Sequence, residues 1–189
     1  MRRFLACPLL ILALLSCQRA PTLPILREGG DFTLTDYNSQ HFELSSLRGK
    51  AVVILFGYTS CPDACPTTLS KLSSVYRNLG DDAKRVKTLY ISVDPGRDTP
   101  AVLKEDLGSF KVDALGLTGT KAEIDKVVAM YGAEYEIIPT PDSAEKYSVA
   151  HTTTLYALDA AGRTRLEFPY DASVDQIVKG LRAILAART

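Results

Sequence analysis

Continuous and alternating apolar patterns along the chain predict its strands. The run AVVILFGY at 51–58 is uninterrupted and β-branched, which is typical of a strand buried on both faces, so we expect it to be central. VKTLYISV at 86–93 predicts a second such strand, and a short one is expected near Leu115. DFTLTDYNSQHFELSSL alternates on both sides of residues 38–40 and predicts a hairpin.

Apolar residues at helical spacing predict four helices, over residues 66–79, 100–110, 120–131 and 174–187. The second should be capped by Asp98 or Thr99, with Pro100 just inside its start. TTTLYALD and RTRLEFPY flank the turn AAG and predict a late antiparallel hairpin. This order predicts an α/β protein with a thioredoxin-like fold, in which helices flank a central mixed sheet and an N-terminal β-hairpin is added.

The first residues have a different character from the rest of the chain. A basic start precedes FLACPLLILALL, which is too short to span a bilayer but suits a secretory signal. The signal ends in LLSC, which is similar to a bacterial lipobox and places the acylated residue at Cys17. We therefore expect a signal peptide with lipobox, a proline-containing tether and one domain, at residues 1–17, 18–26 and 27–189. The protein is then an exported, membrane-anchored lipoprotein facing the periplasm or extracytoplasmic space; an uncleaved anchor helix is the alternative.

Length and charge narrow the classes of partner. A chain of 189 residues suits one domain, and we expect a monomer. Its 22 basic and 22 acidic residues are interspersed, without the basic patch that would neutralise phosphates. Nucleic acid is therefore excluded as an expected partner.

Two cysteines stand between a predicted strand and a predicted helix in FGYTSCPDACPTTLSKL. A disulfide between Cys61 and Cys65 would close so small a loop that it contributes only about 2 kcal/mol. Pro62 and Asp63 indicate an exposed loop at a strand end, where α/β proteins place their chemistry, rather than inert buried thiols. With Pro66 as the first helical residue, Cys65 lies at the helix start, where the dipole favours a thiolate. We expect Cys65 to be reactive, and the pair either to bind a soft metal or to exchange with disulfides.

The chain has two histidines that could complete a metal site. His41 lies near the first hairpin turn and is expected to be a solvated strand residue. His151 opens HTTTLYALD, in the loop entering a strand that borders the cysteine strand in this fold, and is the expected ligand. Two thiolates with an imidazole suit Cu(I), Cu(II) with a weak added ligand, or zinc with an open position. Met130 falls on a helix and is expected to be a core residue.

Three stretches in this order, FGYTSCPDACPTTLSKL, ISVDPGRDTP and YSVAHTTTLYALD, resemble the SCO/SenC family. The resemblance covers the chain from about Phe32 to the C-terminal helix. It implies copper as Cu(I) or Cu(II), with ligands Cys61, Cys65 and His151, and a role in assembling the dinuclear copper centre of cytochrome c oxidase.

The chain departs from the family pattern at two positions. Ala150 stands where the family usually has aspartate, and Ser60 where it often has histidine. A missing carboxylate beside a ligand could weaken the orientation of that ligand. In DPGRDTP, the charged residues Asp94, Arg97 and Asp98 are interpreted as loop and cap residues, with docking of a partner as the less favoured hypothesis.

The leading hypothesis is a copper metallochaperone, which needs no turnover and is therefore not an enzyme. Its partners would be the copper-accepting subunit of cytochrome c oxidase and other periplasmic copper carriers or thiol reductants. The alternative is a thiol-disulfide oxidoreductase, with Cys61 and Cys65 as its catalytic residues, that reduces the cysteines of that subunit. A peroxide-reducing enzyme is a remote third, because the Thr and Arg expected around a peroxidatic cysteine are missing.

Overall fold

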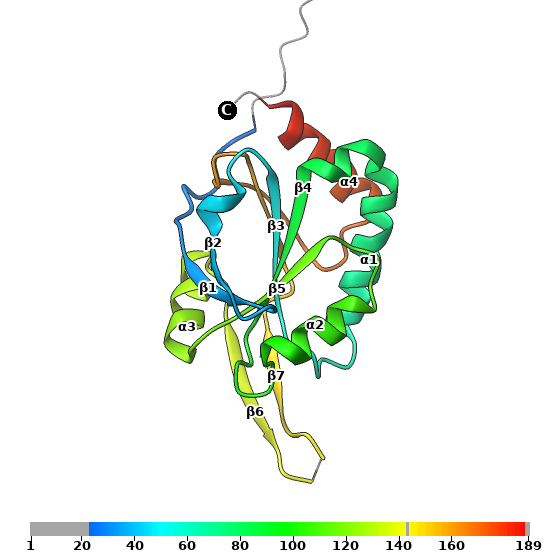
Figure 1. Ribbon diagram of the computed structural model, residues 1–189. Coiled ribbons are helices and arrows are strands. Elements are labelled where there is room, and N and C mark those ends of the chain that lie inside the picture. The colour runs from blue at the N-terminus through cyan, green and yellow to red at the C-terminus, as the bar shows by residue number, and fades with distance from the viewer. Residues whose placement is uncertain (1–22, 143, 188–189) are drawn as a thin grey trace, which may run out of the picture.

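The fold centres on one mixed sheet. A computed structural model describes residues 23–142 and 144–187, so the predicted signal peptide and lipobox lie outside the described residues. Within these ranges seven strands pair in the order β2-β1-β5-β4-β3-β8-β9 (Figure 1). Their bounds are β1 Thr33–Asp36, β2 His41–Glu43, β3 Ala51–Gly57, β4 Val86–Ser92, β5 Ala114–Thr118, β8 Leu155–Leu158 and β9 Thr164–Phe168. The three strands β3, β4 and β5 are parallel, and the others join antiparallel.

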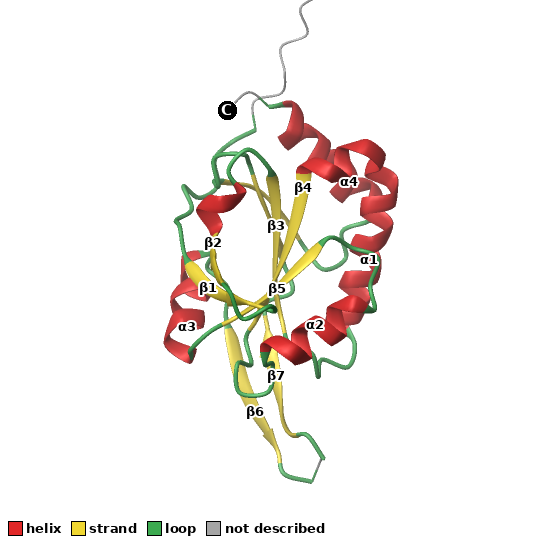
Figure 2. Ribbon diagram, viewed as in Figure 1, coloured by secondary structure: helices red, strands yellow, loops and turns green. Residues whose placement is uncertain are grey.

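Helices cover both faces of this sheet (Figures 1 and 2). The helices are α1 Ala64–Leu79, α2 Pro100–Gly108, α3 Lys121–Met130 and α4 Val174–Ala186, with short 3₁₀ helices η1 Leu44–Leu47 and η2 Gly80–Arg85. Val53 and Leu55 of β3 pack with α1, α2 and α4, whereas Ile54 and Phe56 pack with α3 on the other face. Both faces of β3 are therefore buried, which explains why its sequence is continuously apolar.

A second, two-stranded sheet stands apart from the main one. It is the antiparallel hairpin of β6 Tyr135–Thr140 and β7 Lys146–His151, which extends beyond the rest of the domain (Figure 2). The sequence pattern did not predict it, because its outer strand is exposed, at 48% for Ile137 and 43% for Ile138, and contains Pro139. Most residues of the outer strand β6 therefore face solvent and contribute little to the core.

Most predicted elements are confirmed, including the N-terminal hairpin, the central strand, the late hairpin and the four helices. Several differ in their bounds, among them the following three. Helix α1 begins at Ala64 instead of Pro66, α2 ends at Gly108 instead of Phe110, and β8 begins at Leu155 after the three threonines. The first of these differences changes the chemistry of the cysteines.

The last part of the predicted tether lies against the domain. Leu26 donates its amide to the carbonyl of Thr164 on β9 at 2.9 Å, and the Arg165 side chain donates to the carbonyl of Pro24. Chain contact with the domain therefore begins before residue 27. Among the described residues, none of the helices is long and apolar enough to cross a membrane.

Candidate metal centre

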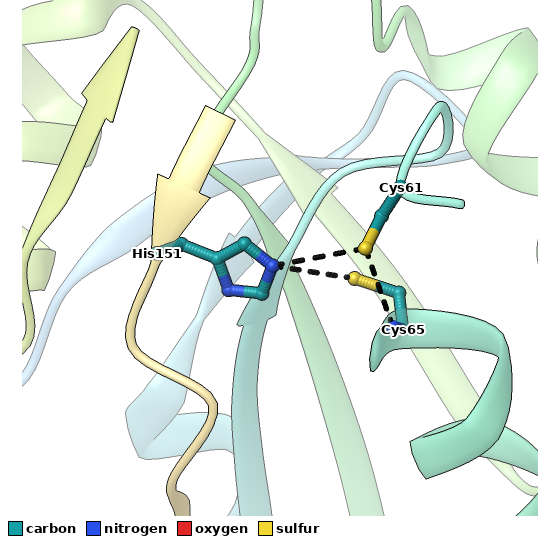
Figure 3. A group of neighbouring side chains, drawn as sticks. All are labelled: Cys61, Cys65 and His151. Carbon is teal, nitrogen blue, oxygen red and sulfur yellow. Dashed lines mark hydrogen bonds between the residues drawn. The ribbon is translucent and has the colours of Figure 1, made fainter. Parts of the chain in front are cut away.

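The cysteine pair lies at the carboxyl end of β3, as predicted. Cys61 is in the loop after the strand, and Cys65 is the second residue of α1. Backbone N–H groups in the first turn of a helix have no partner within the helix. The N–H of Cys65 donates instead to Sγ of Cys61, at 3.4 Å (Figure 3). The free amides of the helix start therefore stabilise negative charge on Cys61.

The expectation that Cys65 is the reactive thiol is wrong. Cys65 is buried, and hydrogen bonding to Cys61, followed by burial, raises the pKa of its thiol. Cys61 is half-buried, and the pKa of its thiol is lowered well below its usual range. The lowering comes first from the Cys65 side chain, which donates to the Cys61 thiolate, then from His151 and from backbone N–H groups, against the effect of burial. The lowered pKa of Cys61 and the raised pKa of Cys65 therefore favour the thiolate on the outer sulfur and the proton on the deeper one.

His151 ends strand β7 and faces both sulfurs. Its Nε2 lies 3.9 Å from Sγ of Cys61 and 3.6 Å from Sγ of Cys65 (Figure 3). Its other ring nitrogen, Nδ1, lies 3.1 Å from the carbonyl oxygen of Thr152. Because a carbonyl only accepts hydrogen bonds, Nδ1 donates to it, and Nε2 is the ring nitrogen that faces the sulfurs. This is the arrangement of a histidine prepared to bind a metal.

The three predicted ligands are brought together. Cys61, Cys65 and His151 place one donor atom each within 4.8 Å of one another, the one such group of three found in the described part of the chain. His41 is exposed on β2, as predicted. Met130 is half-buried and packs against the core cluster under α3, which fits the core role expected for it.

A buried carboxylate that the sequence predicted only as a loop or cap residue holds the cysteine loop. Asp98, fully buried, accepts hydrogen bonds from the backbone N–H of Thr59 at 3.0 Å and from its hydroxyl at 2.7 Å. It also accepts one from the hydroxyl of Ser92 at 2.6 Å. Burial raises the pKa of Asp98, although these hydrogen bonds act against the rise. The α2 cap is Thr99, whose hydroxyl accepts from the N–H of Val102, so Asp98 is free for this role.

Gly57 makes room for the inner sulfur. A Cβ added at this position would lie 2.7 Å from Sγ of Cys65 and 2.8 Å from the hydroxyl oxygen of Tyr90. A glycine at the end of an otherwise apolar strand was the sequence signal for this close approach. The ring of Tyr58 stands perpendicular to that of His151, with centroids 5.8 Å apart.

A groove reaches the metal centre at His151, although neither cysteine lines it. His151 borders a shallow groove of about 710 Å³ between α3 and the β6–β7 hairpin, whose lining includes Asp125, Glu134 and Glu136. A partner could therefore approach the imidazole without any rearrangement of the sheet.

Fold and site together define a class: a thioredoxin-like α/β protein in which a Cys-x-x-x-Cys pair faces a histidine. The SCO1/SenC family model matches residues 22–186. The chain therefore belongs to the SCO1/SenC family, which confirms the resemblance and the thioredoxin-like fold.

Relatives and solved structures agree with this assignment. An SCO2-like protein of Rickettsia felis is 36% identical over 154 residues, covering 82% of this chain and 75% of the relative. ScoI of Bradyrhizobium japonicum, solved with copper bound, is 42% identical with a TM-score of 0.75, covering 83% of this chain and 99% of that one. Yeast Sco1 with copper bound is 31% identical with a TM-score of 0.77, covering 89% and 91%.

One more distant likeness shows the same fold. A disulfide switch is described for BsSco, a member of the Sco family of cytochrome c oxidase assembly proteins. It is 20% identical to this chain, with a TM-score of 0.70 over 88% of this chain and 99% of that one. The two more similar Sco proteins, at 42% and 31% identity, were both solved with copper bound.

Proposed function

We propose that this protein is a copper metallochaperone that carries copper as its cargo to the dinuclear copper centre of cytochrome c oxidase. The observation that carries the proposal is the convergence of Cys61, Cys65 and His151, whose donor atoms lie within 4.8 Å of one another. The copper-bound structures of similar Sco proteins support copper over zinc as the ion.

The donor set fits one soft ion. Thiolate and imidazole donors suit Cu(I), and also Cu(II) when a weak further ligand is added. Bonds of about 2.0–2.3 Å, as imidazole and thiolate make to zinc, would put three donors in a plane about 3.5–4 Å apart. The Nε2 to Sγ distances of 3.6 and 3.9 Å fall in this range. The fold therefore supports binding with little rearrangement.

Release follows from the uneven burial of the ligands. Cys61 and His151 are half-buried, and His151 borders the open groove, whereas Cys65 is buried. A thiolate of the acceptor can therefore replace the outer ligands first, while Cys65 still holds the ion. Such stepwise ligand exchange moves copper to the oxidase subunit without chemical turnover, and a periplasmic copper carrier would reload the site.

The place of action follows from the N-terminal sequence. We propose that the protein is exported and held at the outer face of the membrane by a lipid on Cys17, after cleavage between Ser16 and Cys17 has removed residues 1–16. An anchor of this kind would keep the copper centre near a membrane-bound oxidase.

A thiol-disulfide oxidoreductase is the second candidate, and the lowered pKa of Cys61 favours it. The Cys61 thiolate would attack a disulfide of the acceptor, form a mixed disulfide and release one acceptor thiolate. Cys65 would then displace the second acceptor sulfur and close a Cys61–Cys65 disulfide, its proton passing to the departing thiolates. The acceptor gains two electrons, which a periplasmic thiol reductant must restore to this protein.

A transfer experiment separates the two functions. The copper-loaded mature protein is mixed with the copper-free, reduced copper-accepting domain of the oxidase subunit, and copper in the acceptor is followed by its absorption. The chaperone requires His151→Ala to lose transfer while retaining exchange with a disulfide. Undiminished transfer by that variant would overturn the chaperone proposal as stated.

A further inference from the structure

The loop between β4 and α2 touches both halves of the metal centre. On one side Asp98 holds the cysteine loop through Thr59. On the other side Arg97 reaches the β6–β7 hairpin, which carries His151, and donates to the carbonyl of Tyr147 at 3.2 Å. Neither residue belongs to the donor set, so the loop connects the two parts of the centre without binding the ion.

Arg97 makes several contacts with the hairpin. Its Nη1 donates to the carboxylate of Glu145 at 3.1 Å as well as to the Tyr147 carbonyl. Its guanidinium lies 3.8 Å from the centroid of the Tyr147 ring. A planar guanidinium suits simultaneous stacking and forked hydrogen bonding, which an ammonium group cannot reproduce. Arg97 therefore binds the hairpin by geometry as well as by charge.

Asp94 fixes Arg97 to the body of the protein. Its side chain is 4% exposed and accepts from Nε of Arg97 through one oxygen. The other oxygen accepts from the hydroxyl of Tyr147 at 2.9 Å. The two carboxylate oxygens thus join Arg97 and the hairpin to the same buried point. Charge-assisted hydrogen bonds of this kind are stronger than neutral ones.

The hairpin needs such an attachment because its strands pair with each other and not with the main sheet. An isolated two-stranded hairpin is marginally stable in water. Side chains two residues apart on a strand share a face, so Tyr147, Val149 and His151 point the same way. Val149 is buried and Tyr147 packs against the same core cluster, so this face of β7 lies against the body of the protein.

A second path leads from Arg97 to the imidazole. The guanidinium lies 5.6 Å from the centroid of the Tyr58 ring, which in turn meets the His151 ring at 5.8 Å and a right angle. Arg97 thus fixes the strand that carries His151 and also packs against the ring that borders it.

We infer that Arg97 is a positioning residue that latches the β6–β7 hairpin to the body, so that Nε2 of His151 faces the two cysteine sulfurs. The inference rests on the proposed function for the identity of the ion, copper. The latch itself is a property of the metal-free protein and can be tested without any ion.

The first test is hydrogen exchange in the metal-free protein. Arg97→Ala should raise the exchange rates of the β6–β7 amides by about tenfold, since hydrogen bonds to charged groups are being removed, and leave those of β3 and β4 unchanged. Arg163→Ala is the matched control. The side chains of Arg163 and Arg97 are 26% and 22% exposed, and each pairs with a buried aspartate. Arg163, however, lies in the turn between β8 and β9, away from the β6–β7 hairpin.

The second test is a double-mutant cycle on Cu(I) affinity, measured by competition with a chromophoric chelator. Arg97→Ala should weaken binding by about tenfold when His151 is present and should have no effect in a His151→Ala background. A general loss of structure would weaken both backgrounds equally. Arg97→Lys, which keeps the charge but loses the fork, should give an intermediate loss.

The outcomes separate this inference from the proposed function. Unchanged exchange in the hairpin of Arg97→Ala overturns the latch, whatever the copper result. Failure of the wild-type protein to bind Cu(I) overturns the copper proposal, and the exchange comparison still decides the latch. If Arg97→Ala does not fold, Tyr147→Phe, which removes the hydroxyl donated to Asp94, should show a smaller increase in hairpin exchange, and no increase would overturn the latch.

Discussion

Nε2 of His151 lies 3.6 Å from Sγ of Cys65, although the two residues are 86 positions apart in the chain. The contact joins the end of an exposed hairpin to a buried cysteine in the first turn of α1. It places the Nε2 atom of the imidazole beside two sulfurs that are themselves close together. The proposed chemistry follows from this meeting of three donors.

The order of cysteine reactivity is the first prediction. Because the pKa of Cys61 is lowered, its thiolate persists as the pH falls, whereas an ordinary cysteine becomes protonated below about pH 8.5. In the metal-free reduced protein, iodoacetamide should modify Cys61 before Cys65 and at a rate still high at about pH 6. Peptide mass spectrometry identifies the modified residue.

A variant checks the cause of that lowered pKa. Cys65→Ala removes the thiol that donates to the Cys61 thiolate, so the pKa of Cys61 should rise and its alkylation rate at about pH 6 should fall. Faster alkylation at that pH, or earlier modification of Cys65 in the wild type, would contradict the assignment of the outer thiolate.

Asp98 should contribute more to the free energy of unfolding than an ordinary loop residue does. Asp98→Asn keeps the shape but replaces a carboxylate that accepts three hydrogen bonds by an amide that cannot accept them all. We expect the free energy of unfolding to fall by about 1–3 kcal/mol in urea denaturation. Asp171→Asn, at an exposed position, is the control and should change it by less than about 0.5 kcal/mol. Equal effects of the two substitutions would show that the hydrogen bonds of Asp98 do not stabilise the fold.

Gly57 should be required at the metal centre for steric reasons. Gly57→Ala introduces a methyl group that would meet Sγ of Cys65 at 2.7 Å, so the sulfur must move. We expect weaker Cu(I) binding in chelator competition together with a loss of stability of about 1–3 kcal/mol, as for overpacking elsewhere.

Gly108→Ala is the matched control for that substitution. Gly108 is the last residue of α2, and its added Cβ would meet no atom within 4 Å. It should leave copper binding unchanged and should not lower the free energy of unfolding, because alanine favours helix over glycine. If both glycine variants bind Cu(I) as the wild type does, crowding of Cys65 is not what Gly57 prevents.

The secondary-structure elements that were predicted correctly are those with strong apolar patterns. Strand β3 and helix α4 follow from runs whose burial leaves little choice of structure. The β6–β7 hairpin was missed because exposed Ile137 and Ile138 beside Pro139 carry no core-facing pattern. Because this hairpin was not predicted, His151 was expected in the loop before β8, whereas it is the last residue of β7.

The chemistry of the site depends on contacts that local sequence spacing does not determine. The metal ligands were predicted from residue types and a family resemblance, but the reactive cysteine was assigned to Cys65 because α1 was expected to begin at Pro66. A start two residues earlier directs the N–H of Cys65 at Cys61 and reverses the assignment. Likewise, the bonds of Arg97 to the hairpin depend on tertiary contacts that no local spacing reveals.

The central claim, that three side chains hold one copper ion, is tested most directly by titrating the reduced mature protein with Cu(I) against a chromophoric chelator. We predict one equivalent bound by the wild type, unchanged binding by His41→Ala, and an affinity at least about tenfold lower, or 1.4 kcal/mol, for His151→Ala. Binding by His151→Ala that equals the wild type in both stoichiometry and affinity would contradict the claim.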